Sequence, residues 1–542
     1  AVWVLQGAVL LVLLIACANL ANLLLARAES RRKEFAVRAA LGALRSRLLF
    51  GFIAEGSVLS IAGATLGLVF AVIGIRVLLT AFPDSLPRST EVTLDLRVLS
   101  FTALVALTCG IGFGFAPLLH LSPDRTAMML AESGQRTTSG AGRNRLRHSL
   151  VIGEIALAVA LVIGAGLLLR TLVNLANVDA GFNRSRLVTF GISLPNARYG
   201  KPQQVSDFYQ RLLSKVGAIA GVRGVTAMSG LPPVRRVDAN DTVIEGYQPP
   251  PDRPFTIVDY YQSTTPGYAE TMGIPVVDGR SFNEADRNGP PVVLINETLA
   301  RTFYVGRSPI GRRIKPSGPP RFPFFTVVGV IKDVKQGGVD QKTGSELYFD
   351  TDQLPTALPD FVVGTMNVVL RTALPAEALA GPIRDAVSGL DASLPIVKLR
   401  SMDDVFADSF GRPRLLAGLL GVFAGIALLL AAIGSYGVLS YLVTERRREI
   451  GIRVALGANR ASVLEMVLLH GLRLAGLGIV IGLALAFAFG RALSSLLFGV
   501  VPTDPLTISA VVALTAIVAL AACYVPAHSA TSVDPMIVLR EE

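Results

Sequence analysis

The sequence predicts an α-helical membrane protein with a large α+β domain outside the membrane, and three observations predict it. Only 17% of the 542 residues are charged, whereas a soluble domain carries about 25%. The apolar residues collect into runs of the length that crosses a bilayer. One long mixed segment between the fourth and fifth runs is too polar to lie in lipid. The seven predicted spans are 2–25, 51–79, 98–119, 150–172, 413–443, 464–497 and 505–525.

The basic residues predict the orientation of these spans. Residues 26–50 hold seven Arg or Lys against two Glu, so this loop is expected in the cytoplasm. The net charge of +11 is therefore assigned to membrane topology, and no nucleic-acid partner is expected. Alternation of the spans then places 80–97 and 173–412 outside, and 120–149, 444–463 and the tail from Pro526 inside.

A fifteen-residue segment occurs twice, each time directly after a predicted span. Residues 31–45 and 446–460 are identical at nine of fifteen positions with a constant offset of 415. Apolar residues recur at helical spacing, so each copy predicts a short amphipathic helix along the membrane surface. The alternative is a basic collar that only sets topology, but a collar does not need Glu, Gly and Ala at fixed places twice. The repeated residues of interest are Glu34, Arg38 and Gly42, and Glu449, Arg453 and Gly457.

The repeat is wider than this segment. Asp95 and Pro117, which flank the third span, are matched by Asp504 and Pro526 at the seventh. Residues 1–130 and 413–542 therefore predict two copies of a three-span unit. Only the second copy is preceded by a linker (131–149), a fourth span (150–172) and an external domain (173–412). We expect a matching span and external domain before residue 1, so that the sequence is truncated at its N-terminus.

Pairs of small residues four apart predict close helix packing within the membrane. The predicted packing glycines are Gly63, Gly67, Gly110, Gly114, Gly421, Gly425, Gly478 and Gly482. Gly63 and Gly67 correspond to Gly478 and Gly482 at the offset of 415. Ionisable span residues are taken to be few and near the span ends, which argues against a substrate path through the bilayer. They are Glu55, Arg76, His470 and Arg473.

The external domain predicts mixed α and β structure. It contains neither histidine nor cysteine, which excludes a zinc site built on these residues and a Ser–His or Cys–His nucleophile. Its carboxylates, such as Asp333 and Asp350, are interpreted as loop charges, and no catalytic residue, metal site or cofactor is predicted. Strands are expected at 187–194, 223–228, 257–263, 291–295, 325–334, 345–349 and 365–371, and helices at 203–219, 296–304 and 375–389.

A phosphate-binding Gly-x-x-x-x-Gly-Lys-Ser/Thr segment does not occur in the sequence. Gly200 and Lys201 lack both the upstream glycine and the following hydroxyl. If nucleotide drives the protein, a separate subunit binds it, and this chain is not an enzyme.

The sequence resembles the permease subunits of ATP-binding-cassette systems of the macrolide-exporter and lipoprotein-releasing type (FtsX-like, MacB-like). Its doubled arrangement resembles the duplicated permeases of acidobacterial type. The resemblance rests on Glu-x-x-x-Arg-x-Ala-Leu-Gly-Ala after a span, on 533–540, and on the external segments 272–275, 279–282, 292–297 and 327–330.

This resemblance implies a multi-pass protein of the bacterial inner membrane, surrounded by lipid, with residues 173–412 outside and a cytoplasmic C-terminus. It implies mechanotransmission, in which a separate cytoplasmic ATPase moves a MacB-like periplasmic core domain. The six repeated residues would contact that ATPase, and a periplasmic adaptor is a further expected partner. The outcome would be efflux or extraction of a hydrophobic small molecule, a peptide or a lipoprotein.

Two other functions stay open at this point. One is a signalling or regulatory membrane protein that senses an external ligand or activates a cell-wall enzyme. The other is a membrane enzyme with its chemistry in the external domain, which the lack of histidine and cysteine there opposes.

Overall fold

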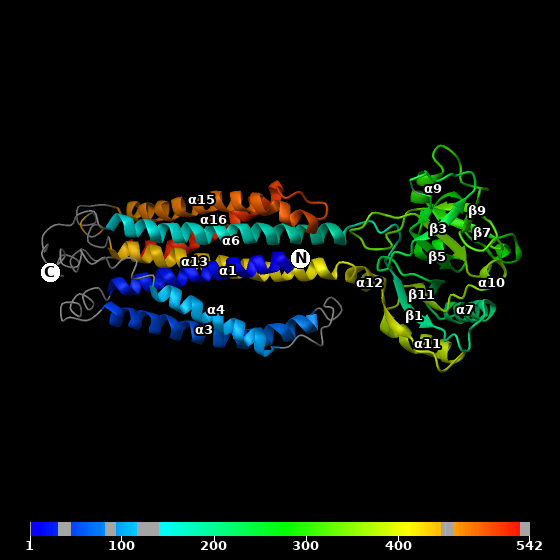
Figure 1. Ribbon diagram of the computed structural model, residues 1–542, viewed down its shortest axis with the longest axis horizontal. Coiled ribbons are helices and arrows are strands. Elements are labelled where there is room, and N and C mark those ends of the chain that lie inside the picture. Colours follow the sequence, from blue (N-terminus) through cyan, green and yellow to red (C-terminus); the bar gives the residue numbers. More distant parts are fainter. Residues whose placement is uncertain are drawn as a thin grey trace. The chain divides into compact units, whose positions relative to one another are not determined.

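The computed structural model describes residues 2–531 apart from 31–44, 82–93, 116–139, 253, 446–449, 451 and 453–458 (Figure 1). The chain divides into two compact units. The first is Ala1–Asn174 together with Arg412–Glu542, and the second is Leu175–Gly411. Every contact given below lies within one unit.

The first unit consists of long helices. They are α1 (Val2–Ser30), α3 (Arg45–Ala81), α4 (Leu96–Phe115), α6 (Gly140–Ala176), α13 (Gly411–Glu445), α15 (Arg460–Leu493) and α16 (Pro505–Thr531), with a 3₁₀ turn η4 (Ser494–Leu496).

Six of these helices are long and apolar enough to cross a membrane. The candidate spans are Val2–Leu25, Ile53–Thr80, Arg145–Ala176, Gly411–Glu445, Ala461–Arg491 and Pro505–Ser529. In α4 only the shorter stretch Leu96–Gly112 qualifies as apolar. The described part of α4 ends at Phe115, before the predicted end of that span at residue 119. The structure therefore supports six of the seven predicted spans by length, and the seventh stays a prediction.

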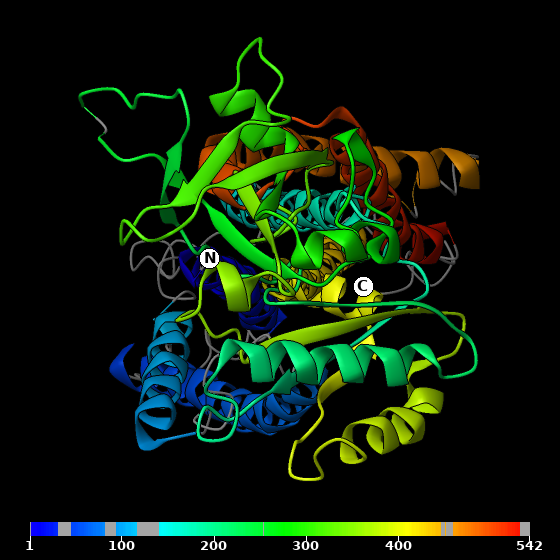
Figure 2. The ribbon, with the colours of Figure 1, turned by 90° about the vertical axis from the view of Figure 1, so that its right-hand side faces the viewer.

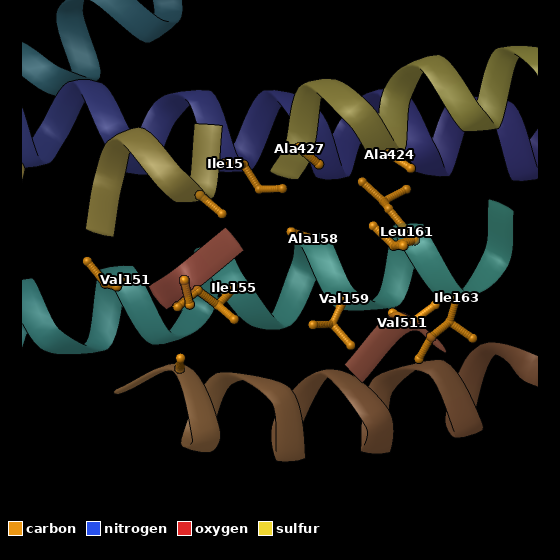
Figure 3. Close-up of a cluster of buried hydrophobic side chains, with 14 of the residues drawn as sticks. Ile15, Val151, Ile155, Ala158, Val159, Leu161, Ile163, Ala424, Ala427 and Val511 are labelled. Atoms are coloured by element: carbon orange, nitrogen blue, oxygen red, sulfur yellow. The ribbon is translucent and has the colours of Figure 1, made fainter. Parts of the chain in front are cut away.

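Helix α6 lies at the centre of the hydrophobic core of the first unit. Figure 3 shows α6 with α1 and α13 on one side and α15 and α16 on the other. Ala158 and Val159 are fully buried there, as are Ile15 of α1 and Ala427 of α13. Of the apolar stretch of α6, 61% is buried, compared with 28 to 33% for α1, α13, α15 and α16. The second repeat is thus packed around a helix that belongs to neither three-span copy.

The second unit contains a twelve-stranded sheet. Its order is β12-β1-β11-β2-β5-β10-β7-β9-β8-β3-β4, with β6 paired to β9. The strands are β1 (Leu187–Ser193), β2 (Val222–Met228), β3 (Asn240–Ile244), β4 (Ile257–Val258), β5 (Tyr260–Thr264), β6 (Val276–Gly279), β7 (Val292–Asn296), β8 (Arg313–Pro316), β9 (Phe325–Ile331), β10 (Glu346–Asp350), β11 (Thr365–Thr372) and β12 (Val397–Ser401).

The helices of the second unit are short. They are α7 (Pro202–Gly217), α8 (Tyr268–Met272), α9 (Glu297–Phe303), α10 (Leu354–Ala357), α11 (Ala376–Ser388) and α12 (Met402–Asp408), with a 3₁₀ turn η3 (Glu284–Asn288). Helix α7 forms because Val205, Phe208, Leu212 and Val216 recur at helical spacing, and all four side chains are buried.

Two separate buried clusters stabilise the second unit. In one, α7 and α11 pack against β1, β11 and β2 (Figure 2). Phe190 lies opposite Val368 in the antiparallel β1–β11 ladder. The other surrounds β7, β9 and β10 and includes Val293, Val327 and Phe349. The mixed α and β structure predicted for this region is confirmed.

Candidate functional site

The six residues predicted to contact an ATPase, Glu34, Arg38, Gly42, Glu449, Arg453 and Gly457, lie outside the described residues, so their role stays a prediction. The structure describes the flanks of the second copy. Ile450 is buried against Val463 of α15 and Val443 of α13. Asn459 caps α15, because its side-chain oxygen accepts a hydrogen bond from the Ala461 amide at 3.2 Å. The second copy is therefore attached to α13 and α15 by apolar packing and a helix cap.

Two of the predicted packing glycines lie where α15 crosses α6. A Cβ atom at Gly478 would lie 2.7 Å from the Cβ of Ile155. A Cβ atom at Gly482 would lie 2.7 Å from the Ala156 carbonyl oxygen and from the Cβ of Val159. Any larger residue would push the two helices apart, since real Cβ atoms do not approach so closely.

The other predicted glycines divide into two groups. Gly110 packs α4 on α3, because its Cβ would lie 2.9 Å from the Ser57 Cα. Gly114 lies at the end of α4, beyond the residues whose contacts are described. The remaining four have no described atom within 4 Å of an added Cβ, and they are Gly63, Gly67, Gly421 and Gly425. Their packing role stays a prediction.

A buried polar cluster joins α6 to α1 and α13. Glu154 of α6 is fully buried, and its Oε1 accepts a hydrogen bond from Asn22 Nδ2 at 3.3 Å. Asn19 Nδ2 donates to the Leu430 carbonyl of α13 at 2.9 Å. Gly434 makes room for this cluster, since a Cβ there would collide with Glu154 and Asn19. Polar contacts of this kind fix how membrane helices pair.

The predicted set of ionisable span residues is therefore incomplete. It omits Glu154, which lies inside an apolar stretch of the fourth span, and Arg170 near the other end of α6. The physical reason is that each side chain finds a partner elsewhere in the fold: Asn22 of α1 for the buried Glu154, and Asp504 in the loop before α16 for the partly exposed Arg170. The sequence does contain a signal for the Glu154 cluster: a lone glutamate in one apolar run, and two asparagines, Asn19 and Asn22, nearly one helical turn apart in another apolar run.

Polar contacts also fasten both ends of α6 to the second repeat. At the C-terminal end, Arg170 forms an ion pair with Asp504. Asn174 Nδ2 donates there to the carbonyls of Phe498 and Gly499 at 3.2 and 3.0 Å. At the N-terminal end, the buried Arg147 guanidinium stacks 3.9 Å from the ring centre of Tyr441. Helix α6 is thus attached to α13, α15 and the loop before α16 along its length.

The external unit has a buried carboxylate of its own. Glu346 of β10 accepts hydrogen bonds from Tyr348 Oη at 2.6 Å and Gln336 Nε2 at 2.9 Å, and Arg235 Nη1 lies 3.4 Å away. Burial raises the pKa of Glu346 to about 7, and the neighbouring arginine opposes this rise. Glu346, Tyr348 and Gln336 are all buried, so we interpret the cluster as structural.

A basic cavity of about 250 Å³ opens on the same unit. Arg371 is fixed there by donating to the carbonyls of Thr271, Ser185 and Asn183. The exposed Arg186 and Arg223 line the same cavity, whose described lining contains no acidic residue. Its chemistry suits an anionic group.

Comparison with known proteins follows the same division of the chain. The model of the MacB-like periplasmic core domain matches residues 149–386. The model of the FtsX-like permease C-terminal domain matches twice, at 7–123 and 421–535. Together these matches cover well over half of the chain.

Three curated relatives illustrate the similarity. YknZ of Bacillus subtilis, an uncharacterized ABC transporter permease, is 25% identical over 51% of this chain and 68% of its own. The pyoverdine export ATP-binding/permease protein PvdT of Pseudomonas aeruginosa is 25% identical over 78% of this chain and 63% of its own. The macrolide export ATP-binding/permease protein MacB of Azoarcus sp. is 28% identical over 52% of this chain and 42% of its own. The chain thus spans less than two thirds of the two ATP-binding/permease relatives.

A solved structure, the periplasmic region of MacB from Actinobacillus actinomycetemcomitans, covers 42% of this chain and 92% of its own, with 13% identity and a TM-score of 0.28. The apolar helices and the match to a periplasmic core domain indicate a multi-pass inner-membrane protein. The chain belongs to the ABC transporter permeases of the MacB and FtsX type, with the FtsX-like domain present twice and the MacB-like periplasmic core domain once.

Proposed function

We propose that this chain is the membrane subunit of a mechanotransmission system, in which a separate cytoplasmic ATPase moves the extracytoplasmic domain. The attachment of α6 carries the proposal. Helix α6 is packed and hydrogen-bonded to α13, α15 and the loop before α16, and it leads directly into the external unit. A movement of the second repeat would therefore take α6 with it.

The proposed topology has seven spans, with α4 as the third. Residues 1–130 and 413–542 form the two three-span copies, 131–149 is a cytoplasmic linker and 150–172 is the added span. Residues 173–412 lie outside and the C-terminus lies in the cytoplasm. The positive charge of the loop at 26–50 supports this orientation.

The two copies of the repeated segment are the proposed ATPase contacts. Each combines a glutamate, an arginine four residues later and a glycine after a further four, in a basic cytoplasmic loop. The nucleotide site is assigned to another subunit, because the sequence lacks a phosphate-binding loop. The names of PvdT and MacB, which are ATP-binding/permease proteins, support coupling to such an ATPase.

The proposed cargo is a hydrophobic small molecule, a peptide or a lipoprotein, exported or extracted with the help of a periplasmic adaptor. The support for this class comes from relatives named for macrolide and pyoverdine export. The buried apolar packing around α6 supports a route outside this part of the bundle, since side chains of α1, α6, α13, α15 and α16 form one buried cluster.

Reversal of charge in both motif copies tests the coupling. The variant Glu34→Lys with Glu449→Lys is compared with Glu29→Lys with Glu445→Lys, which makes the same change of charge in the same loops just outside the motif. Each tagged protein is purified from native membranes, and co-purifying ABC ATPases are identified and assayed. We expect the amount of co-purifying ATPase to fall at least tenfold for the motif variant and to stay unchanged for the control. Equal retention by both variants would show that the segments are only topological collars.

A further inference from the structure

The basic cavity of the external unit lies where three neighbouring strands begin or end. Arg186 directly precedes β1, Arg371 belongs to β11 and Arg223 belongs to β2, and these strands are adjacent in the sheet. The Thr372 amide donates a hydrogen bond to the Arg186 carbonyl at 2.9 Å, and on its other side Thr372 is the register partner of Val222. The sheet therefore brings three guanidinium groups, from residues far apart in the sequence, to one cavity.

These three arginines have no acidic partner in the part of the chain that the structure describes. None of them forms an ion pair there, whereas Arg280 of the same unit pairs with Asp286. Burial lowers the pKa of the Arg371 guanidinium, and no carboxylate opposes this effect. Like charges held close together repel one another, so a bound anion would stabilise this arrangement.

The guanidinium of Arg371 is held in a fixed orientation. Its Nε, Nη1 and Nη2 atoms donate to the carbonyls of Thr271, Ser185 and Asn183 at 2.8, 3.3 and 3.2 Å. A guanidinium carries five N–H groups, so one N–H on each terminal nitrogen is left to donate. Together with the two exposed arginines, this is more donors than the two oxygens of a carboxylate can use, and it suits the oxygens of a phosphate.

The backbone of Arg186 gives an independent indication. Its φ angle is +59°, in the left-handed region, and among the described non-glycine residues only Lys398 shares a positive φ. Glycine adopts this conformation without steric cost, whereas a residue with a side chain does not. An arginine at such a position, at the rim of a basic cavity, points to a use for its side chain there.

The cavity lies close to the end of a candidate membrane span. Ala176 is the last residue of the span formed by α6, and its carbonyl accepts a hydrogen bond from Arg184 Nη2 at 3.1 Å. Arg186 follows Arg184 by two residues, which cover at most about 7 Å. The headgroup layer is about 5–8 Å deep on each side of the hydrocarbon core. Lipid headgroups are therefore a nearby source of phosphate.

We propose that the cavity lined by Arg186, Arg223 and Arg371, the arginine cavity, binds a phosphate group. Its volume of about 250 Å³ is roughly eight times that of a water molecule in the liquid, which leaves room for a phosphate and the atoms attached to it. The phosphodiester of an anionic membrane lipid and free inorganic phosphate both present this chemistry, and the nearness of the α6 end favours the lipid. The inference goes beyond the proposed function, since it does not require an ATPase.

Lipid titration of the full chain tests the arginine cavity. The protein is purified in dodecyl maltoside and titrated with short-chain phosphatidylglycerol or phosphatidylcholine, and bound lipid is counted by native mass spectrometry. We expect Arg186→Gly and Arg223→Gln each to raise the dissociation constant of the tightest-bound phosphatidylglycerol at least tenfold. The matched control is Arg307→Gln, which removes one charge from an exposed arginine after α9 and should leave this constant unchanged. Phosphatidylcholine should bind more weakly, because its choline carries a positive charge.

A second titration, with inorganic phosphate followed by calorimetry, distinguishes the two sources. Phosphate binding that both cavity variants weaken, with phosphatidylglycerol binding unaffected, would support the site and identify free phosphate as its ligand. If neither ligand distinguishes the cavity variants from Arg307→Gln, the proposal is wrong.

Thermal unfolding of the same proteins checks that the variants fold. Arg186→Gly should keep or raise the melting temperature, because glycine suits the backbone at this position. If its melting temperature falls instead, Arg223→Gln alone decides between the two results.

Discussion

Two buried glutamates, one in each unit, show what a single residue contributes to this molecule. Glu154 connects α6 to α1 through Asn22, while Glu346 connects β10 to the segment that carries Arg235. Glu154 lies within an apolar run and Glu346 directly precedes one, so each is visible in the sequence as a charge beside apolar residues. Their partners are not visible in it, because Asn22 is 132 residues from Glu154 and Arg235 is 111 residues from Glu346. The site residues that escape sequence analysis here are those defined by contacts across the fold.

Ionisation of Glu346 should make the stability of the external unit depend on pH. Its pKa is about 7 in the folded protein, raised by burial from an ordinary 4.5. The folded state therefore holds this proton more tightly than the unfolded chain, so the stabilisation is complete below about pH 4.5 and is lost as pH rises through about 7. We expect the free energy of unfolding of Glu346→Gln, which cannot ionise, to fall less than that of the unchanged protein between pH 5 and pH 8, by roughly 1 kcal/mol or more.

Chemical denaturation followed by tyrosine circular dichroism at several pH values measures this difference. Parallel pH profiles for the two proteins would contradict the assignment of a raised pKa to Glu346.

At the scale of the element, the long apolar helices are the part of the fold that the sequence predicts best. Their apolar runs are longer than those usual in helices of soluble proteins. The predicted strands at 187–194, 223–228 and 365–371 are confirmed as β1, β2 and β11, and the predicted helices at 203–219 and 375–389 as α7 and α11. The sequence does not predict β3, β6, β8 or β12. All four residues of β6 are exposed and β8 contains only one non-proline apolar residue, so neither shows the alternation that marks a strand.

Helix packing gives a prediction that uses one repeat as the control for the other. Gly482→Leu should lower the melting temperature of the protein in detergent, because the new side chain would overlap Val159 and separate α15 from α6. Overpacking of this kind costs about 1–3 kcal/mol. Gly67→Leu makes the same change at the equivalent position of α3, where no described atom lies within 4 Å of an added Cβ, and should leave the melting temperature nearly unchanged. Thermal unfolding followed by circular dichroism compares the two, and equal losses would contradict the difference in packing.

At the scale of the whole molecule, the division into two units follows from where apolar side chains gather. Residues 175–411 contain two buried apolar clusters of their own, and all strands of the sheet lie within this segment. We expect this segment, produced alone, to be soluble and to unfold in a single cooperative transition in urea. Well-dispersed amide resonances in its NMR spectrum would confirm a fixed fold, whereas a broad, non-cooperative transition would show that it depends on the helices.

The sequence predicts the place of this external segment well, since polar composition separates it from the spans on both sides. It predicts less about the helix bundle, because hydrophobicity shows that a helix enters lipid but not which helix it meets there. The central position of α6 follows from side chains such as Ala158 and Val159, whose burial depends on α1, α13 and α15 at once.

The seam between α6 and α13 has a mechanical consequence. These two helices are the only covalent links between the units, since the chain enters the external unit at Leu175 and leaves it at Gly411. The two helices are held in register, because Gly434 of α13 makes room for Glu154 of α6 and Tyr441 of α13 stacks on Arg147. A step of about 1.5 Å by the second repeat, the rise of one residue, would therefore arrive at both links at once. The external unit would be pushed by the same amount at its two points of attachment, without being twisted between them.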